Sequence, residues 1–157
     1  MFNILFVCTE NTCRSPMCEY IFKHLLKSAK LTGANCESAG IYAVDGAKYA
    51  DNVRVVLKEL KIIPKKKSKA LTLDLVNKAD LIVPLTSGHK VEIVNKFNCL
   101  NKTQTFAELG GANVSDPYGL GVSGYRETAR IIFDNCVKLI NILLKEGIIC
   151  EKKTSKK

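Results

Sequence analysis

Short apolar runs alternate with amphipathic stretches along this chain. Residues 2–7 (FNILFV) and 81–85 (LIVPL) are continuous apolar runs, a pattern typical of strands buried on both faces. Residues 35–39 (NCESA) and 103–106 (TQTF) are shorter candidates for strands. Pro84 has no backbone N–H, so the 81–85 strand is expected at an edge or an end of its sheet. The pattern therefore predicts four short strands.

Between these runs, apolar residues recur every three or four positions, which is the spacing of one helix face. Ser15 and Pro16 suit the N-cap and the first turn of the first helix, and Gly33 is expected to close it. Further helices are predicted over residues 49–60, 72–78, 87–97 and 122–146. We expect their apolar stripes to form the core.

Alternating strands and helices predict a small, doubly wound α/β domain, with a four-stranded parallel sheet flanked by helices. In such sheets, ligands bind beyond the carboxyl ends of the strands. Cys8 follows the first strand, and the loop that contains Asp116 follows the fourth. We expect one domain over residues 1–150, and a basic, disordered tail over residues 151–157 (EKKTSKK).

The amino-acid composition is that of a globular protein with a basic net charge. The 157 residues are 46% hydrophobic and 25% charged, which excludes extensive disorder, collagen-like repeats and a coiled coil. Lys and Arg total 24 against 15 Asp and Glu, and the net charge of +9 favours an anionic partner such as a phosphorylated substrate. Aromatic residues are only 7% and Trp is absent, which argues against stacking on single-stranded nucleic acid. We expect no nucleic-acid partner.

The numbers of Cys and His residues indicate the cellular compartment of the protein and whether it could hold a structural metal ion. The seven Cys are an odd number, and the N-terminus lacks the basic region and cleavage site of a secretory signal. No apolar run approaches the ~20 residues of a membrane span. We therefore expect a monomer in the cytoplasm, with reduced thiols and no membrane association. The chain has two His and no Cys-x-x-Cys pair, which argues against a structural zinc site.

The segment from Cys8 to Ser15 (CTENTCRS) has the residue types of an anion-binding nucleophilic loop. A tight turn into a helix directs backbone N–H groups and the positive helix end at one point. Arg14 adds a planar fork that matches two phosphoryl oxygens. All three features favour the thiolate of Cys8, and the Ser15 hydroxyl can donate to it. The alternative is that Cys8 is only a small buried residue, but Arg14 in the same turn is hard to bury unpaired.

Two further residues of the loop have less specific roles. Asn tolerates a left-handed backbone and bonds locally, so Asn11 is expected to hold the loop in shape. Cys13 is either a packing residue or a redox partner that forms a disulfide with Cys8 after oxidation.

The stretch VCTENTCRSPM and the sequence Asp116-Pro117-Tyr118-Gly119 resemble the signature loop and general-acid loop of the low-molecular-weight protein tyrosine phosphatases. The resemblance covers residues 2–146. It implies that Cys8 attacks phosphorus without a metal or cofactor, and that Asp116 is the general acid. Without the Cys8 loop, Asp116 would be read as a turn residue. Phosphate-binding residues implied by the resemblance are Thr9, Glu10, Asn11, Thr12, Cys13, Arg14 and Ser15, and Tyr118 is implied as a wall of the pocket.

Two positions depart from the usual pattern of that family. Glu10 replaces a common Gly, so it must accept backbone strain or relax the loop. Thr12 occupies a position that is aliphatic in the tyrosine-specific branch and Thr in the arginine-specific branch. The resemblance therefore implies a metal-independent protein phosphatase that forms a phosphocysteine and removes phosphate from phosphoarginine. A tyrosine phosphatase of the same family is the alternative.

Two other functions are disfavoured. An arsenate reductase of this fold needs two more thiols on a mobile segment, and residues 79–97 contain no Cys. A phosphocarrier or phosphate-binding module would be harmed by a hydrolysing acid such as Asp116. The remaining candidates have simpler interpretations: residues 65–69 (KKKSK) as a solvated loop, and His89 as a surface or packing residue.

Overall fold

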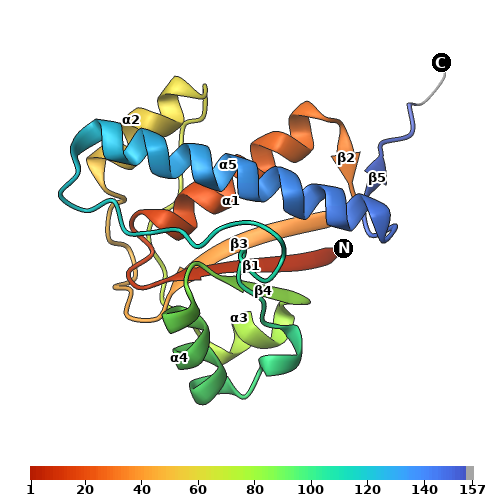
Figure 1. Ribbon diagram of the computed structural model, residues 1–157, viewed down its shortest axis with the longest axis horizontal. Coiled ribbons are helices and arrows are strands. Elements are labelled where there is room, and N and C mark those ends of the chain that lie inside the picture. Colours follow the sequence, from red (N-terminus) through yellow and green to blue (C-terminus); the bar gives the residue numbers. More distant parts are fainter. Residues whose placement is uncertain (155–157) are drawn as a thin grey trace.

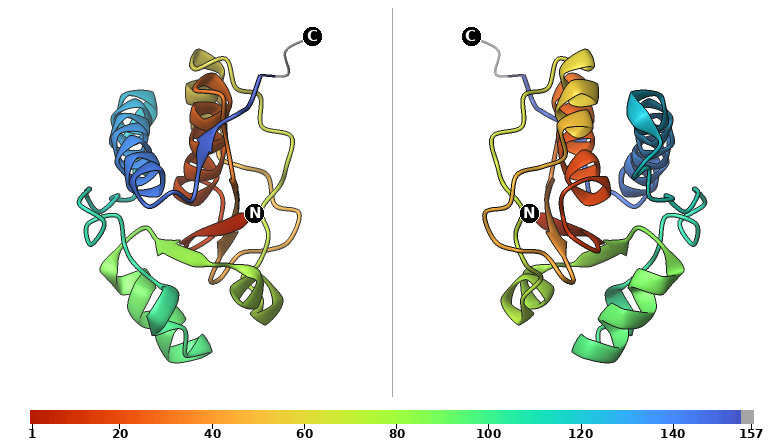
Figure 2. Two further views of the ribbon diagram at one scale, coloured as in Figure 1. Left: turned by 90° about the vertical axis from the view of Figure 1, so that its right-hand side faces the viewer. Right: turned by 90° about the vertical axis from the view of Figure 1, so that its left-hand side faces the viewer.

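The computed structural model describes residues 1–154 and contains a parallel sheet between two layers of helices (Figures 1 and 2). The strands β1 (Phe2–Cys8), β3 (Ala34–Gly40) and β4 (Leu81–Pro84) are arranged in the order β3-β1-β4. Residues 4–8 of the central strand are buried, which explains its continuous apolar run. The α/β fold class is confirmed.

Helices cover both faces of the sheet, as Figure 2 shows. The helices α1 (Arg14–Ser28), α2 (Asp51–Glu59) and α5 (Gly121–Lys145) pack on one face, and α3 (Leu73–Lys78) and α4 (Ser87–Phe97) pack on the other. Alternate residues of β1 divide between the two cores. Phe6 packs with α1 and α5, whereas Leu5 and Val7 pack with α3 and α4.

Phe6 is the centre of the larger core. Its ring lies 5.8 Å from that of Phe22 on α1 in an edge-on arrangement, and 5.8 Å from that of Phe106 in a stacked one. All three side chains are at most 1% exposed. Burial of each contributes about 1.5–3 kcal/mol to folding. This packing fixes the direction of β1, and therefore the place where Cys8 leaves the sheet.

The predicted fourth strand is reduced to a single bridge. Thr103 pairs with Ile82 of β4, and the N–H of Gln104 donates to the Ile82 carbonyl over 3.0 Å. A 3-10 helix, η1 (Leu100–Lys102), precedes this bridge. Thr105 then turns away, because its backbone N–H donates to the Glu108 carboxylate over 3.1 Å.

Both ends of the first helix differ from the prediction. It begins at Arg14, two residues before Pro16, and the cap residue is Cys13 without a side-chain cap bond. Ser15 is therefore not the N-cap. The helix ends at Ser28 rather than near Gly33, because the chain turns through Lys30 at a φ of +53°.

The chain end also differs from the expected disordered tail. A short strand, β2 (Leu31–Thr32), pairs antiparallel with β5 (Cys150–Glu151). The N–H of Lys152 donates to the Lys30 carbonyl over 2.8 Å. Residues 150–152 thus belong to the fold, and residues 155–157 of the predicted tail lie outside the described residues. Among residues 1–154, no helix is both long and apolar enough to cross a membrane.

Candidate active site

The loop between β1 and α1 lies at the carboxyl edge of the sheet. Cys8 is in register with Gly40 of β3, and Val7 is in register with Pro84 of β4, so the three parallel strands end together. In Figure 1 this edge is the left end of the sheet, and the segment that leads into α5 passes along the same side. We call residues 8–15 the phosphate loop.

Asn11 holds the phosphate loop in shape. Its backbone is left-handed at a φ of +54°, and its side chain is 1% exposed. The amide Nδ2 donates to Ser15 Oγ over 2.8 Å, and Oδ1 accepts the Lys69 N–H over 3.0 Å. The Ser68 hydroxyl donates to the Asn11 carbonyl. Residues 65–69 were predicted to be a solvated loop, but two of them brace the phosphate loop.

Gly40 allows the phosphate loop to lie against the end of β3. A Cβ atom at this position would lie 2.7 Å from the Asn11 nitrogen and 2.7 Å from the Glu10 carbonyl carbon. Both neighbours are backbone atoms, so no side-chain movement would relieve the overlap. Gly40 directly follows the strand predicted over residues 35–39, and nothing local to it indicates this contact.

Cys8 and Ser15 form the centre of the loop. The Cys8 sulfur is 2.8 Å from Ser15 Oγ, and both residues are buried. Ser15 Oγ accepts from Asn11 Nδ2, and its own hydrogen has two possible acceptors, the Cys8 sulfur at 2.8 Å and the Ala39 carbonyl at 3.4 Å, of which the sulfur is the nearer. A thiolate has no hydrogen to donate, so Ser15 is the donor whenever Cys8 is ionised. The first turn of α1 directs its free N–H groups toward the same region.

Arg14, which precedes Ser15 in the phosphate loop, is a buried cation. It is 8% exposed, and its Nη1 donates to the Val114 carbonyl over 3.1 Å. Within residues 1–154, no carboxylate forms an ion pair with Arg14. A buried guanidinium normally has an anionic partner, so its remaining donors suit an anionic ligand.

Asp116 follows Val114 by two residues on the exposed segment that leads into α5. Its Oδ1 accepts the Tyr118 N–H over 3.1 Å, which makes a local Asx turn. Its charge is one of the influences on the pKa values of Cys13 and His89, so the carboxylate lies within electrostatic range of the loop. The Tyr118 side chain is 84% exposed, and its role as a wall of the substrate pocket stays a prediction.

Cys13 is a half-buried thiol close to Tyr125 on α5. Burial, together with the nearby Cys8 and Asp116, raises the pKa of the Cys13 thiol to about 12. Cys13 is therefore protonated near neutral pH. All seven cysteines are free, and the role of Cys13 as a redox partner stays a prediction.

The other loop residues differ in their surroundings. The Thr9 hydroxyl is 2.9 Å from Nε2 of His89, a contact that the sequence did not indicate. Glu10 is exposed and needs no strained backbone, since the positive φ falls on Asn11. Thr12 is half-buried, and no hydrogen bond of its hydroxyl is found within residues 1–154, so that hydroxyl is available to a ligand.

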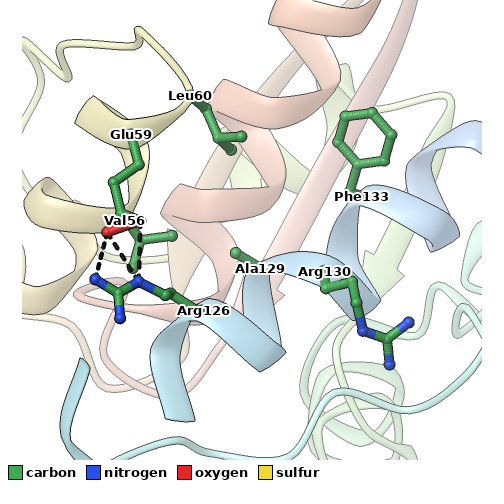
Figure 3. Close-up of a pocket in the computed structure, with 7 residues that line it drawn as sticks. All are labelled: Val56, Glu59, Leu60, Arg126, Ala129, Arg130 and Phe133. Atoms are coloured by element: carbon green, nitrogen blue, oxygen red, sulfur yellow. Dashed lines mark hydrogen bonds and ion pairs between the residues drawn. The ribbon is translucent and has the colours of Figure 1, made fainter. Parts of the chain in front are cut away.

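A separate groove of about 300 Å³ lies between α2 and α5 (Figure 3). It is lined by Val56, Glu59, Leu60, Arg126, Ala129, Arg130 and Phe133. The Glu59 carboxylate is paired with Arg126, and no residue of the phosphate loop lines the groove. The residues that line it include no nucleophile and no unpaired acid. The groove is therefore a weaker candidate for a catalytic site than the phosphate loop. Within the described part of the chain, no group of three or more His, Cys, Asp or Glu is arranged to hold a metal ion.

Comparison with known proteins agrees with this geometry. The family model described as low molecular weight phosphotyrosine protein phosphatase matches residues 3–149. The chain belongs to this family. It consists of protein phosphatases with an active-site cysteine, and the match includes both the phosphate loop and the Asp116 segment.

Members of this phosphatase family with different named substrates are similar to the chain. A protein-arginine-phosphatase of Bacillus subtilis is 34% identical over 148 residues, or 92% of this chain and 95% of the relative. The low molecular weight protein-tyrosine-phosphatase PtpB of Staphylococcus aureus is 35% identical over 150 residues, or 94% and 99%. A solved structure of the YwlE arginine phosphatase, a cysteine-to-serine mutant with a phosphorylated active-site serine, superposes with a TM-score of 0.87 at 33% identity. That superposition covers 92% of this chain and 97% of the YwlE chain.

Proposed function

We propose that this phosphatase hydrolyses phosphoarginine in proteins through a phosphocysteine on Cys8. The observation that supports the chemistry most strongly is the buried Arg14 guanidinium, which has no carboxylate partner in residues 1–154 and belongs to the same phosphate loop as Cys8 and Ser15. It provides charge and two parallel N–H donors for the phosphoryl group. The solved structure of the YwlE mutant also supports phosphorylation at the nucleophile position.

In the first step, the Cys8 thiolate attacks phosphorus, so the S–P bond forms as the P–N bond to the substrate guanidine breaks. Arg14 and the loop N–H groups hold the phosphoryl oxygens in the transition state. The carboxyl group of Asp116 gives its proton to the leaving nitrogen. The products of this step are a phosphocysteine and a neutral or protonated guanidine.

In the second step, water attacks the phosphocysteine. Asp116, now a carboxylate, accepts a proton from that water as the new O–P bond forms and the S–P bond breaks. Inorganic phosphate is released, and Cys8 returns to a thiolate stabilised by the Ser15 hydroxyl. Asp116 thus loses one proton to the leaving nitrogen of the substrate and regains one from water, so the proposed proton transfers require no metal or cofactor.

Thr12 supports phosphoarginine as the substrate. A substrate guanidinium has N–H groups next to phosphorus, and each needs an acceptor when it is buried. The Thr12 hydroxyl is half-buried on the phosphate loop and has no hydrogen bond within the described residues. Glu10 adds a negative charge to the exposed side of the loop, which favours a cationic side chain.

The experiment is hydrolysis of phosphoarginine and phosphotyrosine peptides side by side, in the presence of a metal chelator. We expect a higher kcat/KM for phosphoarginine, with full activity in chelator. A preference for phosphotyrosine would assign the chain to the tyrosine-specific alternative. Failure to hydrolyse either peptide would overturn the phosphatase mechanism.

We further propose that the protein acts as a monomer in the cytoplasm on phosphorylated proteins, without a nucleic-acid or membrane partner. The net charge of +9 supports an anionic substrate. Light scattering at micromolar concentration tests the oligomeric state, and a dimer would contradict this proposal.

A further inference from the structure

His89 is a buried polar residue outside the mechanism described above. It lies in the first turn of α4 and is only 7% exposed. Its backbone N–H donates to Oγ1 of the N-cap residue Thr86 over 3.2 Å, which fixes the backbone. Its ring Nε2 is 2.9 Å from Oγ1 of Thr9, the residue directly after the nucleophile. The ring therefore joins α4 to the phosphate loop.

The other ring nitrogen shows which tautomer makes this contact. Nδ1 of His89 is buried and has no hydrogen-bond partner within residues 1–154. An orphaned buried N–H is rarer in proteins than an orphaned acceptor, so Nδ1 is the nitrogen without hydrogen. Nε2 then carries the hydrogen and donates it to Thr9 Oγ1. Burial and the nearby Arg14 lower the pKa of His89 and outweigh Glu92 and Asp116, which raise it, so the neutral form is favoured.

Thr9 is anchored at two separate atoms. Its carbonyl accepts the N–H of Tyr42 over 2.8 Å, and its hydroxyl accepts from His89. Two positions further along the loop, Asn11 is anchored by Ser68 and Lys69. His89 thus braces from α4 the part of the loop that is closest in sequence to Cys8.

We propose that His89 is a positioning residue for the phosphate loop. By donating from Nε2 to Thr9 Oγ1, it fixes the orientation of the peptide groups next to Cys8, whose N–H groups face the phosphoryl oxygens. This inference rests on the proposed function of that loop. Loop N–H groups stabilise charge that develops in the transition state, so a misdirected group lowers kcat more than it raises KM.

The test compares three substitutions of His89 with p-nitrophenyl phosphate as substrate. The amide nitrogen of Gln is as many bonds from Cα as Nε2 of His, whereas that of Asn reaches only to the place of Nδ1. We expect His89→Leu and His89→Asn to lower kcat by roughly 10- to 100-fold with a change in KM of less than about 3-fold. His89→Gln should retain kcat within about 3-fold of the wild type.

Two controls separate a positioning role from a general loss of structure. In the Thr9→Val variant, His89→Leu should cause little further loss, because the hydrogen bond is already absent. The other histidine, His24 on α1, provides a matched substitution, and His24→Gln should leave kcat unchanged. If His89→Leu does not fold, the contrast between Gln and Asn still tests the proposal.

Nitrogen-15 NMR of the wild-type histidines provides a readout that is independent of turnover. It should show His89 as the neutral tautomer with hydrogen on Nε2. Hydrogen on Nδ1, or a His89→Gln variant as slow as His89→Leu, would overturn the positioning role.

Failure of the proposed function gives a different result, since the wild type itself would then not hydrolyse p-nitrophenyl phosphate. In that case the proposal is judged from the tautomer and from the Kd for orthovanadate, an analogue of the phosphoryl-transfer transition state. His89→Leu should raise that Kd by at least about 3-fold, and an unchanged Kd would contradict the proposal.

Discussion

The Cys8 sulfur lies 2.8 Å from the hydroxyl oxygen of Ser15, although seven positions separate the two residues in the chain. This contact exists because Ser15 lies inside the first turn of α1 rather than at its cap. Its hydroxyl is therefore turned back toward the end of β1. The nucleophile and the start of the helix are joined by one hydrogen bond.

Replacement of Ser15 with Ala should lower both activity and stability. The Cys8 thiolate loses a donor, and the buried Nδ2 of Asn11 loses its acceptor. One lost hydrogen bond of this kind costs about 1–3 kcal/mol of folding free energy, and kcat should fall by about 10-fold or more. Urea unfolding and p-nitrophenyl phosphate turnover measure the two effects. Ser28→Ala, at the exposed end of α1, is the control and should change neither stability nor turnover. If the Ser15 and Ser28 variants behave alike, Ser15 does not stabilise the thiolate or the loop.

The Asp116→Asn variant tests the proton donor. An amide cannot protonate the leaving nitrogen, so turnover of phosphoarginine should slow by roughly 100-fold or more. A leaving group that needs no proton, such as p-nitrophenolate, should suffer a smaller loss in the first step. The ratio of single-turnover rates for the two substrates is the measurement. A near-normal rate on phosphoarginine would remove Asp116 from this role.

The buried carboxyl group of Glu19 should make the free energy of unfolding depend on pH. Burial alone would raise the pKa of its carboxyl, but hydrogen bonds from Lys23 and Lys66 outweigh burial and hold this pKa below its usual range. A lowered pKa in the folded state stabilises the protein above the unfolded value of about 4.3, and the stabilisation disappears as the pH falls through the folded value. The free energy of unfolding should therefore drop in the acid range below about pH 4.3.

In Glu19→Gln, the free energy of unfolding at pH 7 should be lower by about 1–3 kcal/mol, and the acid-range drop should shrink. Glu127→Gln removes an exposed carboxylate that is paired with Arg130, and it is the matched control. Urea unfolding from pH 3 to pH 7 compares the variants. An acid-range drop as large in Glu19→Gln as in the wild type would show that another group is responsible.

The Thr12 hydroxyl should favour phosphoarginine over phosphotyrosine as the substrate. An Ile in its place removes the hydroxyl acceptor and leaves a substrate N–H unpaired, at a cost of about 1–3 kcal/mol. Activity on phosphoarginine should fall by roughly 5- to 100-fold, and the relative activity on phosphotyrosine should rise. Glu10→Gly should have a smaller effect that fades with salt, because Glu10 is exposed. An unchanged ratio of the two activities in Thr12→Ile would make Thr12 a bystander.

The parts of the fold that could be predicted from sequence are those with local causes. The helix over residues 87–97 has the predicted bounds, because Thr86 accepts the His89 N–H as a local cap. The phosphate loop was evident because its reactive residues are adjacent in the chain. The fourth strand was overpredicted, since the carboxylate of Glu108 draws Thr105 into a turn, and the 103–106 pattern does not show this.

The hydrogen bonds that hold the phosphate loop could not be predicted, because their causes are not local. Ser68 lies 57 positions from Asn11, His89 lies 80 positions from Thr9, and Val114 lies 100 positions from Arg14. Each contact depends on how two distant segments pack at the carboxyl edge of the sheet. The local amino-acid pattern does not indicate which distant segments pack together. Ser68 was therefore predicted to be part of a solvated loop, and His89 to be a surface or packing residue.

The proposed mechanism requires that Cys8 becomes phosphorylated during turnover. The most direct measurement is rapid acid quenching of the enzyme with a phosphoarginine peptide, followed by mass spectrometry of the peptide that contains Cys8. We expect a transient phosphate on Cys8, with more of it in Asp116→Asn when p-nitrophenyl phosphate is the substrate, because attack of water then lacks its base. Cys8→Ser should bind inorganic phosphate but show no turnover. Full turnover without any phosphate on Cys8 would exclude the phosphocysteine mechanism.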